Sequence, residues 1–372
     1  MRIGLIAAPW IPIPPAGYGG IERVVDSLAR GFLAAGHDVM LAAASDSACP
    51  APLVPGMRPS EPAEMGMALS ELSHVIRAYD GLGDMDIIHD HTLAGPLVGR
   101  RRSRAPVVTT IHGPLIPAAA DLYRAMAGDT AIIAISRDQA SKVPDVPITR
   151  VIHHGMDVSG VPVGSGGGGY ACFVGRMCPD KGVVEAIKIA RKAGFPLRIA
   201  AKMREPGELE YFRTAVEPIL GTNEEFLGEL GDADKYRLMG EAVAFLNPIQ
   251  WPEPFGLVMI ESLSTGTPVV GTPIGAAPEI VDDGKTGYLA PTEELHKFLP
   301  LAASLDRSHC RDRALKMFST ERMVLNHLDL YAKLVEESQG AVVPHDSYIH
   351  QNRLRGAAVR APEPGPISIR RP

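Results

Sequence analysis

The sequence is poor in cysteine. Only four cysteines occur in 372 residues, and no two of them form a C-x-x-C pair. This scarcity argues against a disulfide framework or a zinc ribbon and is typical of reduced, cytosolic cysteines. An excess of one charge is also missing, because 37 Lys and Arg stand against 43 Asp and Glu, a net charge of −6. We therefore expect no nucleic-acid partner.

A long uninterrupted hydrophobic helix is lacking too. The charge-free stretch from Ile3 to Ile21 has 19 residues, which is long enough for a membrane span. However, the prolines and glycines inside it would break such a helix repeatedly, and no cleavage site follows a basic segment. We expect neither a signal peptide nor a spanning helix, and we expect a cytoplasmic protein.

The composition that is present describes a folded chain. Apolar residues make up 45% and charged residues 22%, which is typical of a globular protein and excludes a disordered or fibrous one. At about 150 residues per domain, the length predicts two domains, each large enough to bury a core of its own.

Short apolar runs of strand type alternate with helical segments along the whole chain. In the first half the predicted strands are MRIGLIAAPW, DVMLAAA, DIIHDHT, APVVTTIHG, TAIIAIS and ITRVIHHG, and a helical period runs from Ile21 to Leu33. In the second half they lie at 170–175 and in PLRIAAK, EFLGEL, AVAFLNP, TPVVGTP and TGYLAP. This alternation predicts an α/β fold with two doubly wound parallel sheets.

A Gly/Ser-rich stretch marks the expected domain boundary. Residues 161–169 lack an apolar period and are predicted to be a flexible linker between a first domain, 1–160, and a second domain, 170–318. A last helix is expected at 319–338, packing back toward the first domain. The basic, Pro-rich residues 339–372 are expected to form a mobile tail. Ligands of two such domains bind in the cleft between the carboxyl ends of the sheets.

A glycine-rich loop follows the first predicted strand. Gly19 and Gly20 stand at the start of a helix, where backbone N–H groups and the helix dipole favour an anion such as phosphate. The alternative is an ordinary turn that begins a helix. The loop is not a dinucleotide-binding fingerprint, because Glu22 occupies the position of the third glycine.

Two basic residues follow the first strand of the second half. In GRMCPDKG, Arg176 comes directly after Gly175, and Lys181 precedes the last glycine. An arginine fork and a lysine ammonium can clamp a diphosphate. The alternative is a pair of solvated surface charges, which is common for Arg and Lys.

Two carboxylates lie in and just after the segment EPFG. Glu253 is its first residue, and Glu261 lies on the helix that it opens. A carboxylate accepts hydrogen bonds from vicinal hydroxyls of a ribose or hexose, and the N–H groups of Gly256, Leu257 and Val258 suit a phosphate. The alternative is a glutamate that only complements the helix dipole.

Several histidines end strands of the first half. His89 and His91 share a strand face and could form half of a metal site, but no further ligands with suitable spacing accompany them. His112 ends another strand at the side of the expected cleft, where a neutral imidazole could hydrogen-bond a sugar hydroxyl. The alternative is an ordinary loop histidine.

The order of these segments resembles a known family. GGIERVV, DIIHDHT, TIHG, HHGMD, GRMCPDKG, FLGEL, EPFGLVMIES, GTPVVGTPIGAAPEIV and DGKTGYL together resemble the family-4 retaining glycosyltransferases, from residue 1 to about 337. The resemblance implies the GT-B fold, two Rossmann-like domains that face each other across a cleft. It also implies transfer of a sugar from a nucleoside-diphosphate donor to an acceptor hydroxyl, with retention and without a metal or other cofactor.

The resemblance assigns roles to individual residues. Glu261 would hold the donor ribose and Glu253 the transferred sugar, while Arg176 and Lys181 would neutralise the diphosphate and His112 would contact the donor sugar. The catalytic residues implied are His112, Arg176, Lys181 and Glu253. The donor-binding residues implied are Gly19, Gly20, Gly175, Arg176, Lys181, Glu253, Phe255, Gly256, Leu257, Val258 and Glu261.

Some features leave alternatives open. His154 and Ala276 depart from the family pattern beside the cleft, which leaves the sugar and the acceptor undecided. Another GT-B enzyme, such as a nucleotide-sugar epimerase or a phosphorylase, is the alternative function. We expect UDP as the nucleotide, and a small-molecule or oligosaccharide acceptor in secondary-metabolite, antibiotic or polysaccharide biosynthesis. Membrane association is not favoured, although the basic segment 101–104 keeps it open.

Overall fold

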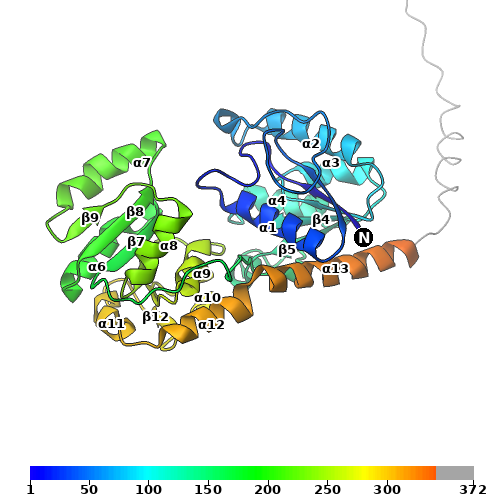
Figure 1. Ribbon diagram of the computed structural model, residues 1–372. Coiled ribbons are helices and arrows are strands. Elements are labelled where there is room, and N and C mark those ends of the chain that lie inside the picture. The colour runs from blue at the N-terminus through cyan, green and yellow to red at the C-terminus, as the bar shows by residue number, and fades with distance from the viewer. Residues whose placement is uncertain (341–372) are drawn as a thin grey trace, which may run out of the picture.

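The computed structural model describes residues 1–340, except for the side chain of Arg100. The expected tail, 339–372, therefore lies almost wholly outside the described residues. The chain forms two α/β domains side by side, each built on a six-stranded parallel sheet (Figure 1). This arrangement confirms the predicted fold class. Within the described residues no helix is long and apolar enough to cross a membrane.

Every strand predicted from the sequence is present. The first sheet consists of β1 (Arg2–Ile6), β2 (Asp38–Ala42), β3 (Ile87–Asp90), β4 (Val107–Ile111), β5 (Thr130–Ala134) and β6 (Arg150–Val151). The second consists of β7 (Ala171–Arg176), β8 (Leu197–Lys202), β9 (Glu224–Phe226), β10 (Phe245–Asn247), β11 (Val269–Gly271) and β12 (Gly287–Leu289).

Helices connect the parallel strands. Those of the first domain are α1 (Gly20–Ala34), α2 (Ala68–Leu82), α3 (Gly95–Arg102), α4 (Pro117–Met126) and α5 (Arg137–Ser141). The second domain contains α6 (Val183–Ala193), α7 (Pro206–Tyr211), α8 (Asp232–Glu241), α9 (Leu257–Ser264), α10 (Ala277–Ile280), α11 (Leu295–Ala302) and α12 (Arg307–Phe318). The last described helix is α13 (Thr320–Gly340).

The strand order places a crevice in each sheet. The first sheet has the order β2-β1-β3-β4-β5-β6 and the second β12-β11-β10-β7-β8-β9. The winding direction therefore reverses between β1 and β3 in one domain and between β7 and β10 in the other. Such reversal points open a crevice at the carboxyl ends of the strands, where α/β proteins bind ligands.

The core of the first domain includes the end of the chain. Helix α1 packs its apolar face on β1 through residues such as Leu28 and Phe32. Helix α13 leaves the second domain and lies along α1, adding the buried side chains Met323 and Tyr331 to the same core (Figure 1). The last helix is thus part of the first domain.

Two crossing segments join the domains side by side. The Met156 N–H donates to Phe318 O at 2.9 Å, and the Thr320 N–H donates to Met156 O at 3.0 Å. A Cβ at Gly155 would lie 2.3 Å from Ser319 O, so this close approach requires glycine. The two segments form one paired connection between the domains.

The Gly/Ser-rich segment differs from the expectation of a flexible linker. The N–H groups of Gly164, Gly166 and Gly168 donate at 2.9–3.0 Å to carbonyls of the second domain. The Arg307 guanidinium also donates to Gly164 O, at 3.1 Å. Residues 161–169 are therefore tied to the second domain, because the lack of side chains lets the backbone approach closely.

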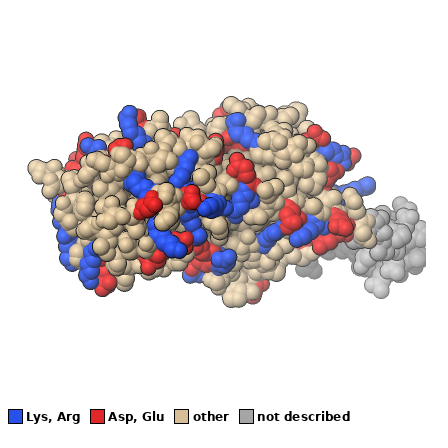
Figure 2. Space-filling view, turned by 60° about the horizontal axis from the view of Figure 1, so that its bottom comes forward, with Lys and Arg blue, Asp and Glu red and all other residues tan. Residues whose placement is uncertain are grey.

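Charges on one face of the molecule are mixed. Figure 2 shows acidic and basic side chains interspersed there, without a broad area of one sign. A face of this kind creates no extended positive field of the sort that attracts nucleic acid.

Candidate active site between the two domains

A cleft of about 550 Å³ lies between the domains. Its first wall is the β1–α1 loop with the start of α1. Its second wall combines the carboxyl ends of β7 and β8 with the beginnings of α8 and α9. Both walls therefore belong to the crevices that the strand orders define.

Six of the predicted donor-binding residues line this cleft. They are Gly19, Gly20, Gly175, Leu257, Val258 and Glu261. A Cβ at Gly20 would lie 3.4 Å from Leu257 Cδ1, so the two domains touch at this point. A Cβ at Gly19 would lie only 2.7 Å from Pro15 Cβ, so the loop has room only for glycine.

Helix α9 presents its N-terminus to the cleft. Gly256 caps the helix with φ of 98°, a left-handed conformation that favours glycine. The first N–H groups of a helix have no partner within it, and here Leu257 and Val258 line the cleft. Together with the helix dipole they provide a place for an anionic group.

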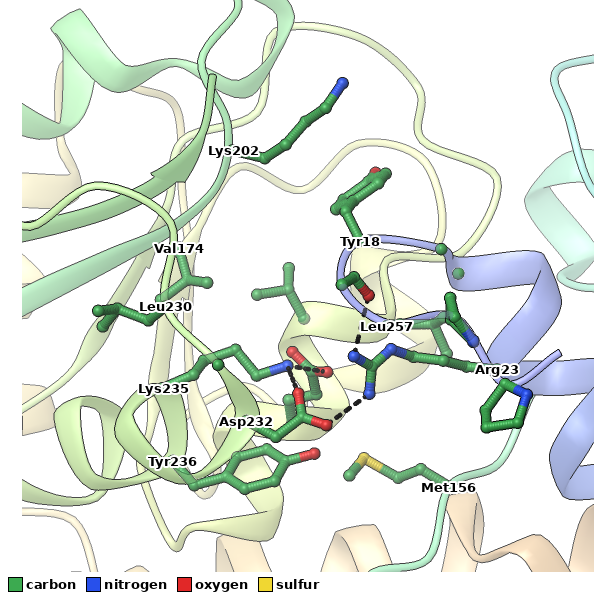
Figure 3. Close-up of a pocket in the computed structure, with 18 of the residues that line it drawn as sticks. Tyr18, Arg23, Met156, Val174, Lys202, Leu230, Asp232, Lys235, Tyr236 and Leu257 are labelled. Carbon is green, nitrogen blue, oxygen red and sulfur yellow. Dashed lines mark hydrogen bonds and ion pairs between the residues drawn. The ribbon is translucent and has the colours of Figure 1, made fainter. Parts of the chain in front are cut away.

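Ion pairs connect the two walls. Lys235 Nζ donates to Glu261 Oε1 at 2.6 Å and lies 3.1 Å from Asp232 Oδ1. Asp232 accepts at 2.7 Å from Arg23, which belongs to α1 and also donates to Gly17 O at 3.1 Å. Figure 3 shows Arg23, Asp232 and Lys235 pointing toward one another across the cleft. The carboxylate of Glu261 is thereby held in place at the second wall.

The predicted cations are placed differently from each other. Lys181 is buried and forms an ion pair with Glu253, and neither residue lines the cleft. Arg176 is half-buried and makes no ion pair or side-chain hydrogen bond within residues 1–340. Lys202, paired in register with Arg176 on the neighbouring strand, lines the cleft. Lys202 is ion-paired with Glu205 and Glu208, and Arg176 does not line the cleft itself but follows Gly175, which does.

The EPFG segment is more buried than expected. Phe255 is only 2% exposed and packs edge-on against His154 and Phe318, with ring centroids 5.2 and 6.1 Å apart. It supports the segment from behind and does not line the cleft. The Glu253 Oε2 atom is buried without a hydrogen-bond partner in the described part of the chain. A buried acceptor of this kind is normally satisfied by a partner or a ligand.

The histidines form a buried array beside the cleft. His112 follows β4, hydrogen-bonds His91 at 2.9 Å and stacks on His154 with ring centroids 5.4 Å apart. Burial lowers the pKa of His112 to about 3, so its imidazole is neutral. His112 lies next to the cleft without lining it. His89 and His91 do share a face, with centroids 3.9 Å apart. Among the residues that the structure describes, no group of three suits a metal ion.

Several cleft residues were not predicted from the sequence. Arg23, Lys202, Asp232 and Lys235 come from three different segments and meet only in the folded chain. Lys202 ends a predicted strand and Arg23 lies one turn after Gly20, so the sequence pattern could have identified both as residues at the cleft. Asp232 and Lys235 open a helix of ordinary charged residues, and nothing in their local sequence marks them.

Comparison with known proteins gives consistent results. The family model for glycosyltransferase family 4 matches residues 18–159, and the model for glycosyl transferases group 1 matches residues 164–304. A phosphatidyl-myo-inositol mannosyltransferase of Mycobacterium tuberculosis is 25% identical over 325 residues, covering 79% of this chain and 83% of that protein.

Solved structures agree with these matches. AviGT4, a glycosyltransferase involved in avilamycin A biosynthesis, is 26% identical with a TM-score of 0.67, covering 90% of this chain and 98% of its own. HepE of Anabaena, in complex with UDP and glucose, shares the fold at 19% identity and a TM-score of 0.70, covering 89% and 99%. With matches in both domains and the GT-B architecture, this chain belongs to the family-4, or group 1, glycosyltransferases.

Proposed function

We propose that this glycosyltransferase moves a sugar from a nucleoside-diphosphate donor, UDP being the nucleotide, to an acceptor hydroxyl with retention of configuration. The observation that carries the proposal is the cleft between the domains, where the Glu261 carboxylate held by Lys235, the N-terminus of α9 and the ammonium group of Lys202 face one volume. The use of UDP is supported by the Anabaena protein of the same fold, which binds it.

The second wall suits the donor. Glu261, oriented by Lys235, would accept hydrogen bonds from the ribose hydroxyls. The N-terminus of α9 beside Gly175 would face the diphosphate, with Arg176 and Lys202 as nearby positive charges. Lys181 would reach the diphosphate only by leaving Glu253. Glu253 would then offer both carboxylate oxygens to hydroxyls of the transferred sugar.

The chemistry needs charge stabilisation more than a protein nucleophile. As the bond from the anomeric carbon to the diphosphate oxygen breaks, negative charge develops on the leaving group. Fixed cations and helix N–H groups stabilise that charge best because they need not reorganise. The acceptor oxygen then bonds to the anomeric carbon on the same face, and its proton passes to the departing phosphate oxygen.

We propose that no metal ion takes part. Arg176 and Lys202, joined by Lys181, would supply the positive charge that a divalent ion supplies in other sugar transfers. Because these cations would act on the diphosphate, their effect would not depend on which sugar is transferred.

We propose a soluble acceptor, either a secondary metabolite or a polysaccharide precursor. The 26% identity to AviGT4, which acts in avilamycin A biosynthesis, supports the first of these. The β1–α1 loop and the start of α1 form the wall opposite the donor, so the acceptor would enter along them.

The test is a panel of nucleotide sugars incubated with the enzyme and followed by proton NMR. We expect slow hydrolysis of one donor, with the released sugar first appearing in the anomeric configuration of the donor. Release of the inverted anomer would contradict retention. Conversion of the sugar within the intact donor would indicate an epimerase instead, and turnover that requires inorganic phosphate would indicate a phosphorylase.

A further inference from the structure

A hydrogen-bonded pair of histidines, the buried His91 and the half-buried His112, stands beside the cleft, and only His112 has a place in the function described so far. His91 Nδ1 and His112 Nε2 lie 2.9 Å apart, within hydrogen-bond distance. The remaining ring nitrogens, His91 Nε2 and His112 Nδ1, are buried and have no partner in the described part of the chain. Each of these orphan nitrogens needs an explanation, because buried polar atoms are rarely left unpaired.

The hydrogen bond couples the two rings chemically. Burial lowers the pKa of both imidazoles, so both are neutral and each carries a single N–H. If His91 donates, His112 must carry its own hydrogen on Nδ1 and is a donor there. If His112 donates, its Nδ1 is a bare acceptor. The tautomer of His91 therefore decides what the free nitrogen of His112 can bind.

The ring of His112 is also fixed by its other neighbours. His154 stacks on it with an interplanar angle of 18°, and His154 contacts Phe255 of the EPFG segment edge-on. On the far side of the pair, the ring centroids of His89 and His91 lie 3.9 Å apart. Both ring nitrogens of His89 form hydrogen bonds, one with Tyr331 and the other with Thr110. His91 is thus held in place by residues that never reach the cleft.

We propose that His91 is a positioning residue of the transfer reaction, which fixes the tautomer and orientation of His112 so that Nδ1 meets a hydroxyl of the transferred sugar. The inference rests on the proposed function, in which His112 contacts the donor sugar. The two orphan nitrogens carry it further, because the pair shares one hydrogen, and the free nitrogen of His112 is the one that the proposed function brings to the donor sugar.

The first experiment measures the tautomer directly and needs no substrate. Protein labelled with ¹⁵N at histidine is examined by long-range proton–nitrogen correlation, and the His112 signals are assigned with a His112→Gln variant. We expect a single tautomer in the wild type and in His91→Asn, whose amide still offers a hydrogen-bonding atom. We expect a mixture in His91→Phe. An unchanged His112 tautomer in His91→Phe would overturn the proposal.

The second experiment measures transfer with the identified donor. Removing His91 as a hydrogen-bond partner should lower kcat about 10-fold to 100-fold in His91→Phe, with the donor KM within about 3-fold of wild type. His91→Asn should recover most of the loss. The matched control is His74→Phe, another buried histidine of the same domain with one hydrogen bond, to Ala7 O at 2.9 Å.

The outcomes separate the two proposals. Wild-type kcat in His91→Phe, or an equal loss in His91→Asn and in His74→Phe, would overturn the positioning role, since the effect would then be absent or only structural. If the wild type transfers no sugar, the proposed function fails. The NMR result still decides whether His91 sets the tautomer of His112.

Discussion

The two domains share one architecture but differ in the charge state of the titratable side chains that they bury. In the first domain the buried titratable groups are mostly neutral histidines, among them His74, His89 and His91. In the second domain they are ion pairs. Lys235 with Glu261 is 12% and 14% exposed, and Lys202 with Glu208 is 11% and 5% exposed.

This difference suggests that the two domains have different roles in the proposed reaction. A leaving diphosphate needs positive charge nearby, and the second domain carries charges that are already paired and oriented. In the proposed reaction, the histidines of the first domain would offer hydrogen bonds without adding charge beside the reacting carbon, while its Arg23 is paired with Asp232. Similar parallel sheets thus support unlike surroundings, because the side chains at the strand ends, and not the sheets, set the chemistry.

The largest effect expected from this difference between the domains is a loss of stability of the first domain in mild acid. Burial lowers the pKa of the first-domain histidines, so the unfolded chain binds protons that the folded one does not, and stability falls as pH drops below about 6.5. Each such histidine contributes a slope of about 1.4 kcal/mol per pH unit. In the second domain, the hydrogen bond from Arg191 lowers the pKa of Glu224. The stability that this carboxylate contributes is therefore lost only when the pH falls below about 4.5.

The two tryptophans allow the domains to be followed separately. Trp10 belongs to the first domain and Trp251 to the second. In urea titrations at pH 7.5 and 5.5, we expect Trp251→Phe, which keeps Trp10, to lose more of its unfolding midpoint than Trp10→Phe. Equal losses for the two variants would contradict the difference between the domains.

Glu253→Gln tests the role of a charged residue of the second domain in the transfer step. The amide keeps a hydrogen-bond acceptor for Lys181 but removes the charge that faces the transferred sugar, so turnover should fall about 100-fold. Binding of free nucleoside diphosphate, measured by calorimetry, should stay within about 3-fold. Glu225→Gln, at an exposed glutamate of the same domain, is the control. A large loss of nucleotide affinity would place Glu253 elsewhere on the donor.

Glu261→Ala should act on the other end of the donor. Without this carboxylate the ribose hydroxyls lose their acceptor, at a cost of about 1–3 kcal/mol, or about 5-fold to 150-fold in affinity. The loss should be the same for the free nucleoside diphosphate and for the intact donor, as calorimetry with both ligands can show. A loss confined to the intact donor would assign Glu261 to the sugar.

Arg23→Gln tests the link between the two sides. The Arg23–Asp232 ion pair is 36% and 43% exposed, so its removal should change the free energy of unfolding by at most about 1 kcal/mol. The donor KM should rise a few-fold more than in Arg30→Gln, because Arg30 pairs with Asp26 inside the same helix of the first domain. Equal KM values for the two variants would show that the connection across the cleft does not assist donor binding.

A chelator should have the smallest effect. If the charges of the second domain suffice for the leaving diphosphate, transfer rates with and without EDTA should agree within error. Activity that EDTA abolishes and manganese or magnesium restores would contradict the metal-free proposal.

The sequence predicted the architecture well because strand patterning is local. Runs such as PLRIAAK and TPVVGTP are short, apolar and bounded by turn residues, and each became a strand. The residues after the strands followed from the same pattern, which is why Gly175 and Glu261 line the cleft. The hydrogen bonds that tie 161–169 to the second domain could not be predicted, because composition does not show that glycine N–H groups find carbonyl partners.

Contacts between distant segments could not be predicted. The pairing of Lys181 with Glu253 joins residues 72 positions apart, and that of Arg23 with Asp232 joins residues 209 apart. The burial of Phe255 depends on His154 and Phe318, from two other parts of the chain. Such partners are set by packing in three dimensions, which no local period records.

The return of α13 to the first domain determines the order in which the protein can be made. Met323 and Tyr331 complete a core whose members outside α13 lie between Ile3 and Ile152. During synthesis that core must therefore wait until the ribosome has passed through the entire second domain. Multidomain chains usually fold from the N-terminus onward at about 5–20 residues per second. Here the domain that is synthesised first is completed last, by the last described helix, α13.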